Sequence, residues 1–275
     1  MANVSARVET VRTDGFMMDY CRFGRGKDAL VILPGMSVQQ VMLSANAVTQ
    51  SYAGMAEDFT FYVFERRNDM PEGYTVRDMA RDTAAAIQAL GLGTVRLFGA
   101  SQGGMLALLI ATERPELVRG MVLGSTSAQV TEAQYRDVFE KWAALARAGD
   151  AAALYLAFGE ALYPKRMFEK LRPLLLQNAK AVTAEDLWRF IVQAEAMKGF
   201  DVRRNLAKVA CPTLVIGDTE DNVFGGEAAA RLAEGIKGCE LYMYDGYGHA
   251  VYDLAPDYRE RMRKFLIPEN ETSRF

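Results

Sequence analysis

Short, mostly apolar runs recur along the chain and are separated by longer stretches of mixed polarity. They fall at residues 30–33, 59–64, 95–98, 119–123, 213–216 and 240–244. Runs of this length and composition are typical of strands that are buried on both faces of a parallel sheet. Near the start, segments 8–11 and 16–23 flank Asp14-Gly15 and predict an antiparallel hairpin, because Asp-Gly is a strong turn signal.

Helices are predicted between the strands. Thr75 and Asp78 have the spacing of a capping box, apolar residues follow at helical spacing to Leu90, and Gly91 fits the position just past a helix end. Further helices are expected within residues 39–57, 226–237 and 252–265. Repeated strand–helix units predict an α/β fold with a mostly parallel central sheet flanked by helices on both faces.

One block interrupts this alternation, because residues 131–200 have a helical pattern throughout and contain no convincing strand. Thr131 and Thr183 are candidate helix caps, each with a partner side chain three residues later. We expect the block to lie over the carboxyl ends of the strands, where open α/β sheets bind ligands. The prediction is a core domain of residues 1–126 and 201–275 with an inserted helical cap, or lid, of residues 127–200.

Composition narrows the class of protein. The 275 residues are half hydrophobic and carry a net charge of −3, with no basic run of the kind that binds nucleic acid. Residues 1–10 lack the apolar region of a signal peptide, and the longest apolar run, 105–111, is far short of the ~20 residues of a membrane span. The cysteines, Cys21, Cys211 and Cys239, suit neither a disulfide framework nor a metal site. We therefore expect a cytoplasmic protein with neither nucleic-acid nor membrane partners.

Gly99-Ala100-Ser101-Gln102-Gly103 joins an expected strand to an expected helix and has the Gly-x-Ser-x-Gly pattern of a nucleophile elbow. Glycine suits both ends, because strand and helix backbones pass this closely only where no Cβ intervenes. The helix that begins after Ser101 directs its free N–H groups towards any oxyanion formed there. The alternative is a glycine-rich turn with an inert serine, so the other residues that such chemistry needs have to decide.

A serine nucleophile needs a base, and the chain has a single histidine, His249, in a glycine-rich loop after the last expected strand. A lone histidine is more often structural, but the position of His249 at the carboxyl edge of the sheet favours its acting as the general base. The base in turn needs a carboxylate. Asp218, Glu220 and Asp221 follow another strand end; Asp221 is favoured because it lies deepest in the loop, whereas Asp218 and Glu220 are interpreted as solvated or turn-forming. Asp245 is interpreted as a turn residue.

The order Ser101, Asp221, His249 and the motifs around these residues resemble those of the α/β-hydrolase superfamily. The resemblance extends from about residue 16 to residue 265 and implies an α/β-hydrolase fold with an inserted helical cap. It also implies an oxyanion hole formed by the backbone N–H groups of Met36 and Gln102. Many relatives have His-Gly where this chain has Pro34-Gly35, but the donor required there is a backbone N–H, which Met36 supplies.

Ser101, in place of the aspartate of haloalkane dehalogenases and epoxide hydrolases, argues against those two branches. No metal cluster is evident and no Gly-x-Gly-x-x-Gly follows a strand, so no cofactor is implied. Arg66-Arg67 is interpreted as a structural ion-pair partner near the elbow rather than as a subunit contact. The oligomeric state stays open, with a homodimer as one alternative.

Aromatic residues are concentrated in the helical block and predict an enclosed, apolar pocket. Its expected lining includes Met36, Trp142, Phe158 and Trp188. The favoured function is a serine hydrolase that acts on a small, largely apolar carboxylic ester or lactone. The same constellation also supports carbon–carbon bond hydrolysis, perhydrolysis or acyl transfer, and some relatives of this fold are small-ligand receptors.

Overall fold

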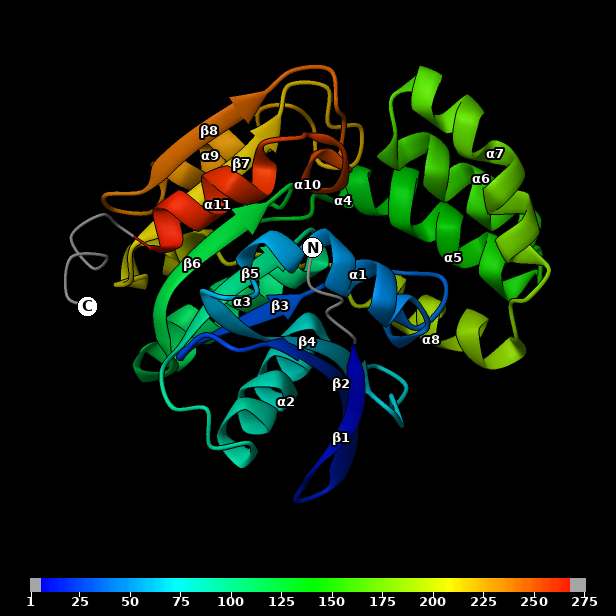
Figure 1. Cartoon of the computed structure of the whole chain (residues 1–275). Coiled ribbons are helices and arrows are strands. Elements are labelled where there is room, and N and C mark those ends of the chain that lie inside the picture. The colour runs from blue at the N-terminus through cyan, green and yellow to red at the C-terminus, as the bar shows by residue number, and fades with distance from the viewer. Residues whose placement is uncertain (1–5, 268–275) are drawn as a thin grey trace.

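The computed structural model describes residues 6–267, which form one eight-stranded sheet with helices on both faces (Figure 1). The sheet has the order β1-β2-β4-β3-β5-β6-β7-β8. The opening hairpin pairs antiparallel, as does β2 with β4, and all later pairs are parallel. The strands are β1 (Arg7–Thr13), β2 (Phe16–Gly24), β3 (Asp28–Leu33), β4 (Phe59–Arg67), β5 (Val95–Ala100), β6 (Val118–Gly124), β7 (Thr213–Asp218) and β8 (Glu240–Tyr244).

Alternating side chains of the central strands supply two hydrophobic cores, one on each face. On β3, Val31 and Leu33 belong to one core, whereas Leu30 and Ile32 belong to the other, as the period of two in a strand requires. The first core is covered by α2 (Val76–Ala89), α3 (Gln102–Glu113) and α9 (Ala228–Glu234). The second is covered by α1 (Ala45–Ser51), α10 (Val251–Leu254) and α11 (Tyr258–Leu266).

A helical insertion connects β6 to β7 and lies beside the carboxyl edge of the sheet (Figure 1). Its elements are α4 (Glu132–Gln134), a π-helical turn η4 (Tyr135–Phe139), α5 (Glu140–Arg147), α6 (Ala151–Leu162), α7 (Lys165–Ala179) and α8 (Ala184–Glu195). The Thr131 and Thr183 side chains cap α4 and α8 as predicted. The two ends of the insertion pair with each other, since Val130 N–H donates to Phe200 O and Val202 N–H donates to Ala128 O.

Two expected helices are interrupted. The segment 39–57 contains a short 3₁₀ turn, η1 (Val41–Ser44), then α1, then a second 3₁₀ turn, η2 (Ala53–Met55). The expected closing helix 252–265 is split into α10 and α11, because Ala255 is extended ahead of Pro256. The remaining 3₁₀ turns are η3 (Pro115–Leu117) and η5 (Arg203–Lys208). Within residues 6–267, no helix combines the length and apolar character of a membrane span.

Candidate active site

Ser101 occupies a strained turn between β5 and α3, with φ of 53° and ψ of −122°. This backbone region is unfavourable for a residue with a side chain and is typical of a nucleophile elbow. Close packing enforces the turn: a Cβ on Gly103 would lie 1.8 Å from Leu33 O. Hydrogen bonds from Ser101 N–H to Gly124 O (2.8 Å) and from the Thr126 hydroxyl to Ser101 O (2.7 Å) hold the serine backbone.

His249 and Asp221 form a buried pair at the carboxyl edge. His249 Nδ1 lies 3.0 Å from Asp221 Oδ1 and 2.9 Å from Oδ2. A carboxylate in this position favours the tautomer with the proton on Nδ1, which leaves Nε2 as an acceptor. Burial alone would raise the pKa of Asp221, but the attraction and hydrogen bond of His249, with N–H donors from Phe224 and Val223, lower it overall. Asp221 is therefore a carboxylate at neutral pH.

The neighbouring carboxylates have other partners. Asp218 accepts hydrogen bonds from the N–H groups of Glu220 (2.8 Å) and Tyr247 (2.9 Å). It is turn-forming, but it is buried rather than solvated, because it closes two loops at once. Asp245 accepts from the Thr219 hydroxyl. Among the described residues, only Asp221 is joined to His249 by a hydrogen bond.

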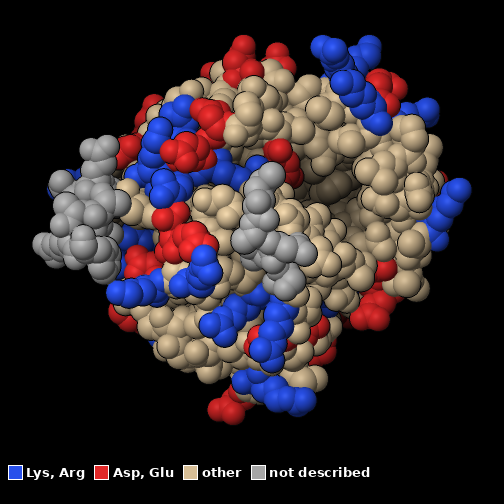
Figure 2. Space-filling view, in the orientation of Figure 1, with Lys and Arg blue, Asp and Glu red and all other residues tan. Residues whose placement is uncertain are grey.

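Ser101 and His249 both line a small cavity of about 10 Å³, which has room for one water molecule at most. Figure 2 shows a hollow in the surface between the helical insertion and the rest of the molecule. No hydrogen bond joins Ser101 Oγ to His249 in residues 6–267; in apo enzymes such contacts are often long and tighten only when substrate binds. The other lining residues are Gly35, Met36, Phe139, Trp142, Phe158, Leu162, Val223 and Tyr252.

Three of the four predicted pocket residues, Met36, Trp142 and Phe158, line this cavity. Trp188 does not line it; this residue is 44% exposed on α8, because that helix turns Arg189 and Phe190 towards the interior. Phe139 and Tyr252 also line the cavity and were not predicted to do so. Both could have been predicted from their positions in the sequence, because Tyr252 lies three residues after His249 and Phe139 lies in the aromatic-rich block.

The loop after β3, which contains Met36, passes against the serine, and Gln102 directly follows the serine in the chain. A Cβ on Gly35 would lie 3.0 Å from Ser101 Cβ, so the loop passes directly against the nucleophile. Within the described part of the chain, the backbone N–H groups of Met36 and Gln102 donate no hydrogen bond. Two free N–H groups beside a serine are the arrangement that an oxyanion requires.

Arg66, on β4, is buried against this loop. Its Nη2 donates to Pro34 O (2.9 Å) and to Gln102 Oε1 (3.0 Å). The interpretation of Arg66 as an ion-pair partner was therefore wrong. Its guanidinium donates hydrogen bonds to two uncharged oxygens, and none of the ion pairs among residues 6–267 includes it. Arg67 points the other way and forms ion pairs with Asp69 and Asp82.

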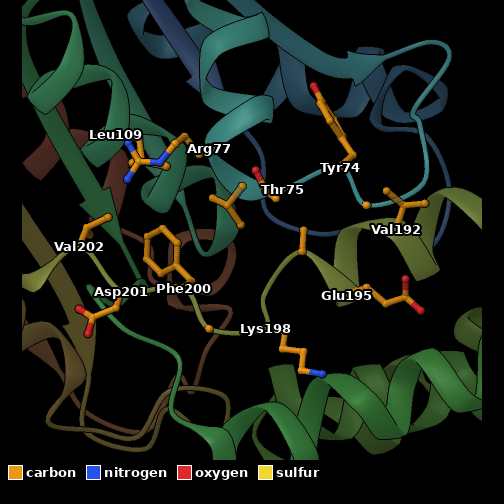
Figure 3. A pocket seen from close by; sticks show the side chains of 14 residues that line it. Tyr74, Thr75, Arg77, Leu109, Val192, Glu195, Lys198, Phe200, Asp201 and Val202 are labelled. Carbon is orange, nitrogen blue, oxygen red and sulfur yellow. The ribbon is translucent and has the colours of Figure 1, made fainter.

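A second cavity, of about 400 Å³, lies between the start of α2 and the end of α8 with the segment 196–202 that follows it (Figure 3). It contains neither Ser101 nor His249. Three of its charged side chains already form ion pairs: Arg77 with Glu113, Glu195 with Arg147 at 2.6 Å, and Asp201 with Arg203 at 2.7 Å. In the part of the chain that the structure describes, no cluster of three or more His, Cys, Asp or Glu residues could hold a metal ion.

Comparison with known proteins adds to this geometry. The family described as "alpha/beta hydrolase fold" matches residues 48–256. "Putative carbamate hydrolase RutD" of Klebsiella pneumoniae is 29% identical over 188 residues, covering 68% of this chain and 70% of that protein. "Serine hydrolase BPHL" of Mus musculus is 27% identical over 272 residues, covering 93% and 85%. The crystal structure of the enol-lactonase from Burkholderia xenovorans superposes with a TM-score of 0.81 at 19% identity, covering 94% of this chain and 99% of that one.

Proposed function

The chain belongs to the α/β-hydrolase fold family and is a hydrolase, and we propose that it cleaves a small, largely apolar carboxylic ester or lactone with a Ser101–His249–Asp221 triad. One observation carries the proposal: a strained serine and a carboxylate-bound histidine open into the same apolar cavity. The name of the mouse relative, a serine hydrolase, supports the same nucleophile.

The reaction begins when Ser101 Oγ attacks the substrate carbonyl carbon and His249 Nε2 takes the hydroxyl proton. The tetrahedral intermediate collapses, the carbon–oxygen bond to the leaving group breaks, and His249 returns the proton to the leaving alkoxide. Water then attacks the acyl-enzyme with His249 as base, and the second collapse releases the acid and restores the serine. Asp221 stays ionised throughout and stabilises the imidazolium that forms in each half-reaction.

In both tetrahedral intermediates the carbonyl oxygen carries a negative charge. We assign its stabilisation to the backbone N–H groups of Met36 and Gln102, one from the loop after β3 and one from the first residue of α3. In serine hydrolases each such donor lowers the activation free energy by about 3–4 kcal/mol. The dipole of α3, whose amino end faces the serine, acts in the same direction.

The lining of the cavity supports the substrate class. Apart from Ser101 and His249, its described residues are apolar or aromatic and none carries a charge. A substrate with a carboxylate or phosphate beside the scissile bond would lose its hydration there without gaining a partner. This favours a neutral ester or lactone over the charged substrates of some carbon–carbon bond hydrolases.

We also propose that residues 127–200 act as a cap over the site. Phe139, Trp142, Phe158 and Leu162 of the insertion form one wall of the cavity. Because the cavity holds one water molecule at most, an ester must displace these side chains to reach Ser101.

The test is intact mass after incubation with a small p-nitrophenyl alkylphosphonate. We expect one covalent adduct on the wild type and none on Ser101→Ala. Ser125→Ala is the matched control, because Ser125 is a buried serine after the next strand with a similar φ of 44°; it should still give the adduct. A wild-type protein that is folded and yields no adduct would contradict the triad. Release of p-nitrophenol from acetate and butyrate esters, and ring opening of γ-lactones, then identify the substrate.

A further inference from the structure

The guanidinium of Arg66 joins the two chain segments that supply the oxyanion donors. In the sheet, β3 lies between β4 and β5. Arg66 stands near the end of β4 and reaches across the extension of β3 to the first residue of α3. One nitrogen, Nη2, donates both to Pro34 O and to Gln102 Oε1. Three strand ends are therefore held together through a single side chain.

Each of its two acceptors is covalently close to a proposed donor. Pro34 O belongs to the peptide that leads into Gly35, and the next peptide carries the N–H of Met36. Gln102 itself carries the other N–H. Because a backbone peptide turns as a unit, fixing Pro34 O limits the directions open to the peptide that follows.

The Gln102 side chain is held at both ends. Arg66 donates to Gln102 Oε1. Gln102 Nε2 in turn donates to Gln193 O (2.9 Å), in α8, and contacts Met197 Sδ (3.3 Å), just after α8. Gln102 is fully buried, so water cannot replace these partners. Arg66 thus completes a clamp that runs from the loop after β3 through the elbow to the insertion.

Stability alone is a poor reason for this arrangement. A buried guanidinium loses its hydration, and this loss is usually offset by a paired carboxylate. Arg66 is 3% exposed, and no carboxylate forms an ion pair with it among residues 6–267. Its Nε has no hydrogen-bond partner in that range either. Burial lowers the pKa of the guanidinium, although the Glu65 carboxylate opposes this shift, and an arginine stays protonated at neutral pH.

We propose that Arg66 is a positioning residue for the oxyanion hole, whose bonds to Pro34 O and Gln102 Oε1 set the spacing of the Met36 and Gln102 N–H groups. The proposal rests on the function proposed above, because it presupposes an oxyanion at Ser101. Arg66 does not touch the substrate; it acts through the two residues that do.

The test compares Arg66→Met and Arg66→Lys with Arg67→Met, using steady-state hydrolysis of p-nitrophenyl acetate. Because misplacement of a catalytic group by about 1 Å lowers rates ~100-fold, we expect kcat of Arg66→Met to fall by about that factor with KM unchanged. Arg66→Lys should recover part of kcat, since an ammonium can still donate to both acceptors. Arg67→Met should lower the melting temperature, because it removes two ion pairs, and leave kcat per folded molecule unchanged.

A second variant keeps the proposal testable if Arg66→Met does not fold. Gln102→Met removes the Oε1 acceptor and keeps the backbone N–H, and we expect its kcat to fall about tenfold. In the double variant with Arg66→Lys, kcat should fall by less than the product of the two single effects. The proposal is overturned if kcat of Arg66→Met stays within twofold of the wild type, if only KM changes, or if activity falls only in proportion to the folded fraction. A wild type without phosphonate adduct or turnover would instead contradict the triad, so the two failures are distinguishable.

Discussion

Replacing Asp221 by Asn tests the assignment of the acid without changing the shape of the site. Asn Oδ1 can keep the N–H donors of Val223 and Phe224, which now bond to the carboxylate at 2.8 and 3.0 Å. The amide Nδ2 would face His249 Nδ1 and donate to it, so the imidazole would carry its proton on Nε2. In that tautomer it cannot accept the proton of Ser101. The same exchange in a serine protease lowers kcat about 10⁴-fold, which corresponds to roughly 5.4 kcal/mol at 1.36 kcal/mol per tenfold change.

The assay measures kcat for p-nitrophenyl acetate together with urea unfolding of each variant. Asp221→Asn should lose about 1–2 kcal/mol of stability, because its N–H contacts lose their charge-assisted strength. Asp218→Asn is the matched control. Asp218 is also buried and also accepts two backbone N–H groups, those of Glu220 and Tyr247, so its replacement should cost a similar amount of stability and keep kcat within about tenfold. If Asp221→Asn kept more than a tenth of the wild-type kcat, the reasoning would be refuted. A 10⁴-fold loss in Asp218→Asn alone would move the acid to Asp218.

Three further predictions concern packing, specificity and pH. Gly103→Ala should unfold at markedly lower urea concentration than Gly54→Ala, because its Cβ would lie 1.8 Å from Leu33 O whereas nothing lies within 4 Å at Gly54; equal midpoints would contradict the elbow packing. Phe158→Ala should raise the ratio of kcat/KM for butyrate over acetate esters by about tenfold, since it removes a ring from the cavity wall; an unchanged ratio would place the acyl group elsewhere. The pKa of Asp221 is lowered in the fold, so its ionisation stabilises the protein above the unfolded value of about 3.9 and is lost as pH falls through the lower folded pKa; the stability gap between wild type and Asp221→Asn should be larger at pH 7 than at pH 3.

The strands could be predicted closely because a strand buried on both faces needs a nearly continuous apolar run. The predicted runs 30–33 and 213–216 lie inside β3 and β7, and every residue of these two runs is buried. The run 240–244 also coincides with a strand, β8, but this strand lies at the edge of the sheet and its first residues are exposed. The expected α/β-hydrolase fold is confirmed. Helix ends were predicted less closely. The expected helix 252–265 runs through Pro256, although the residue before a proline is biased away from the helical conformation, and the structure breaks the helix there.

Within the site, the motifs located Ser101 and His249 because each loop follows a strand, and parallel strands bring such loops to one edge. That these two residues and Asp221 act as a triad stays a prediction. Trp188 does not line the cavity at Ser101, because the rotation of α8 about its axis depends on packing, which composition does not reveal. The contacts of Arg66 depend on β4, β3 and β5 being neighbours in that order, which the order along the chain does not reveal.

The cavity of about 10 Å³ at Ser101 is too small for an ester, so the proposed reaction requires the aromatic side chains around it to move apart first. For such a site, the apparent dissociation constant is the intrinsic one divided by the fraction of molecules that are open. Two esters of equal chemistry but different bulk would then differ in how far they force apart the rings of Phe139, Trp142 and Phe158. The selectivity of the proposed hydrolase would then depend on the free energy needed to separate these rings, as well as on the shape of the pocket.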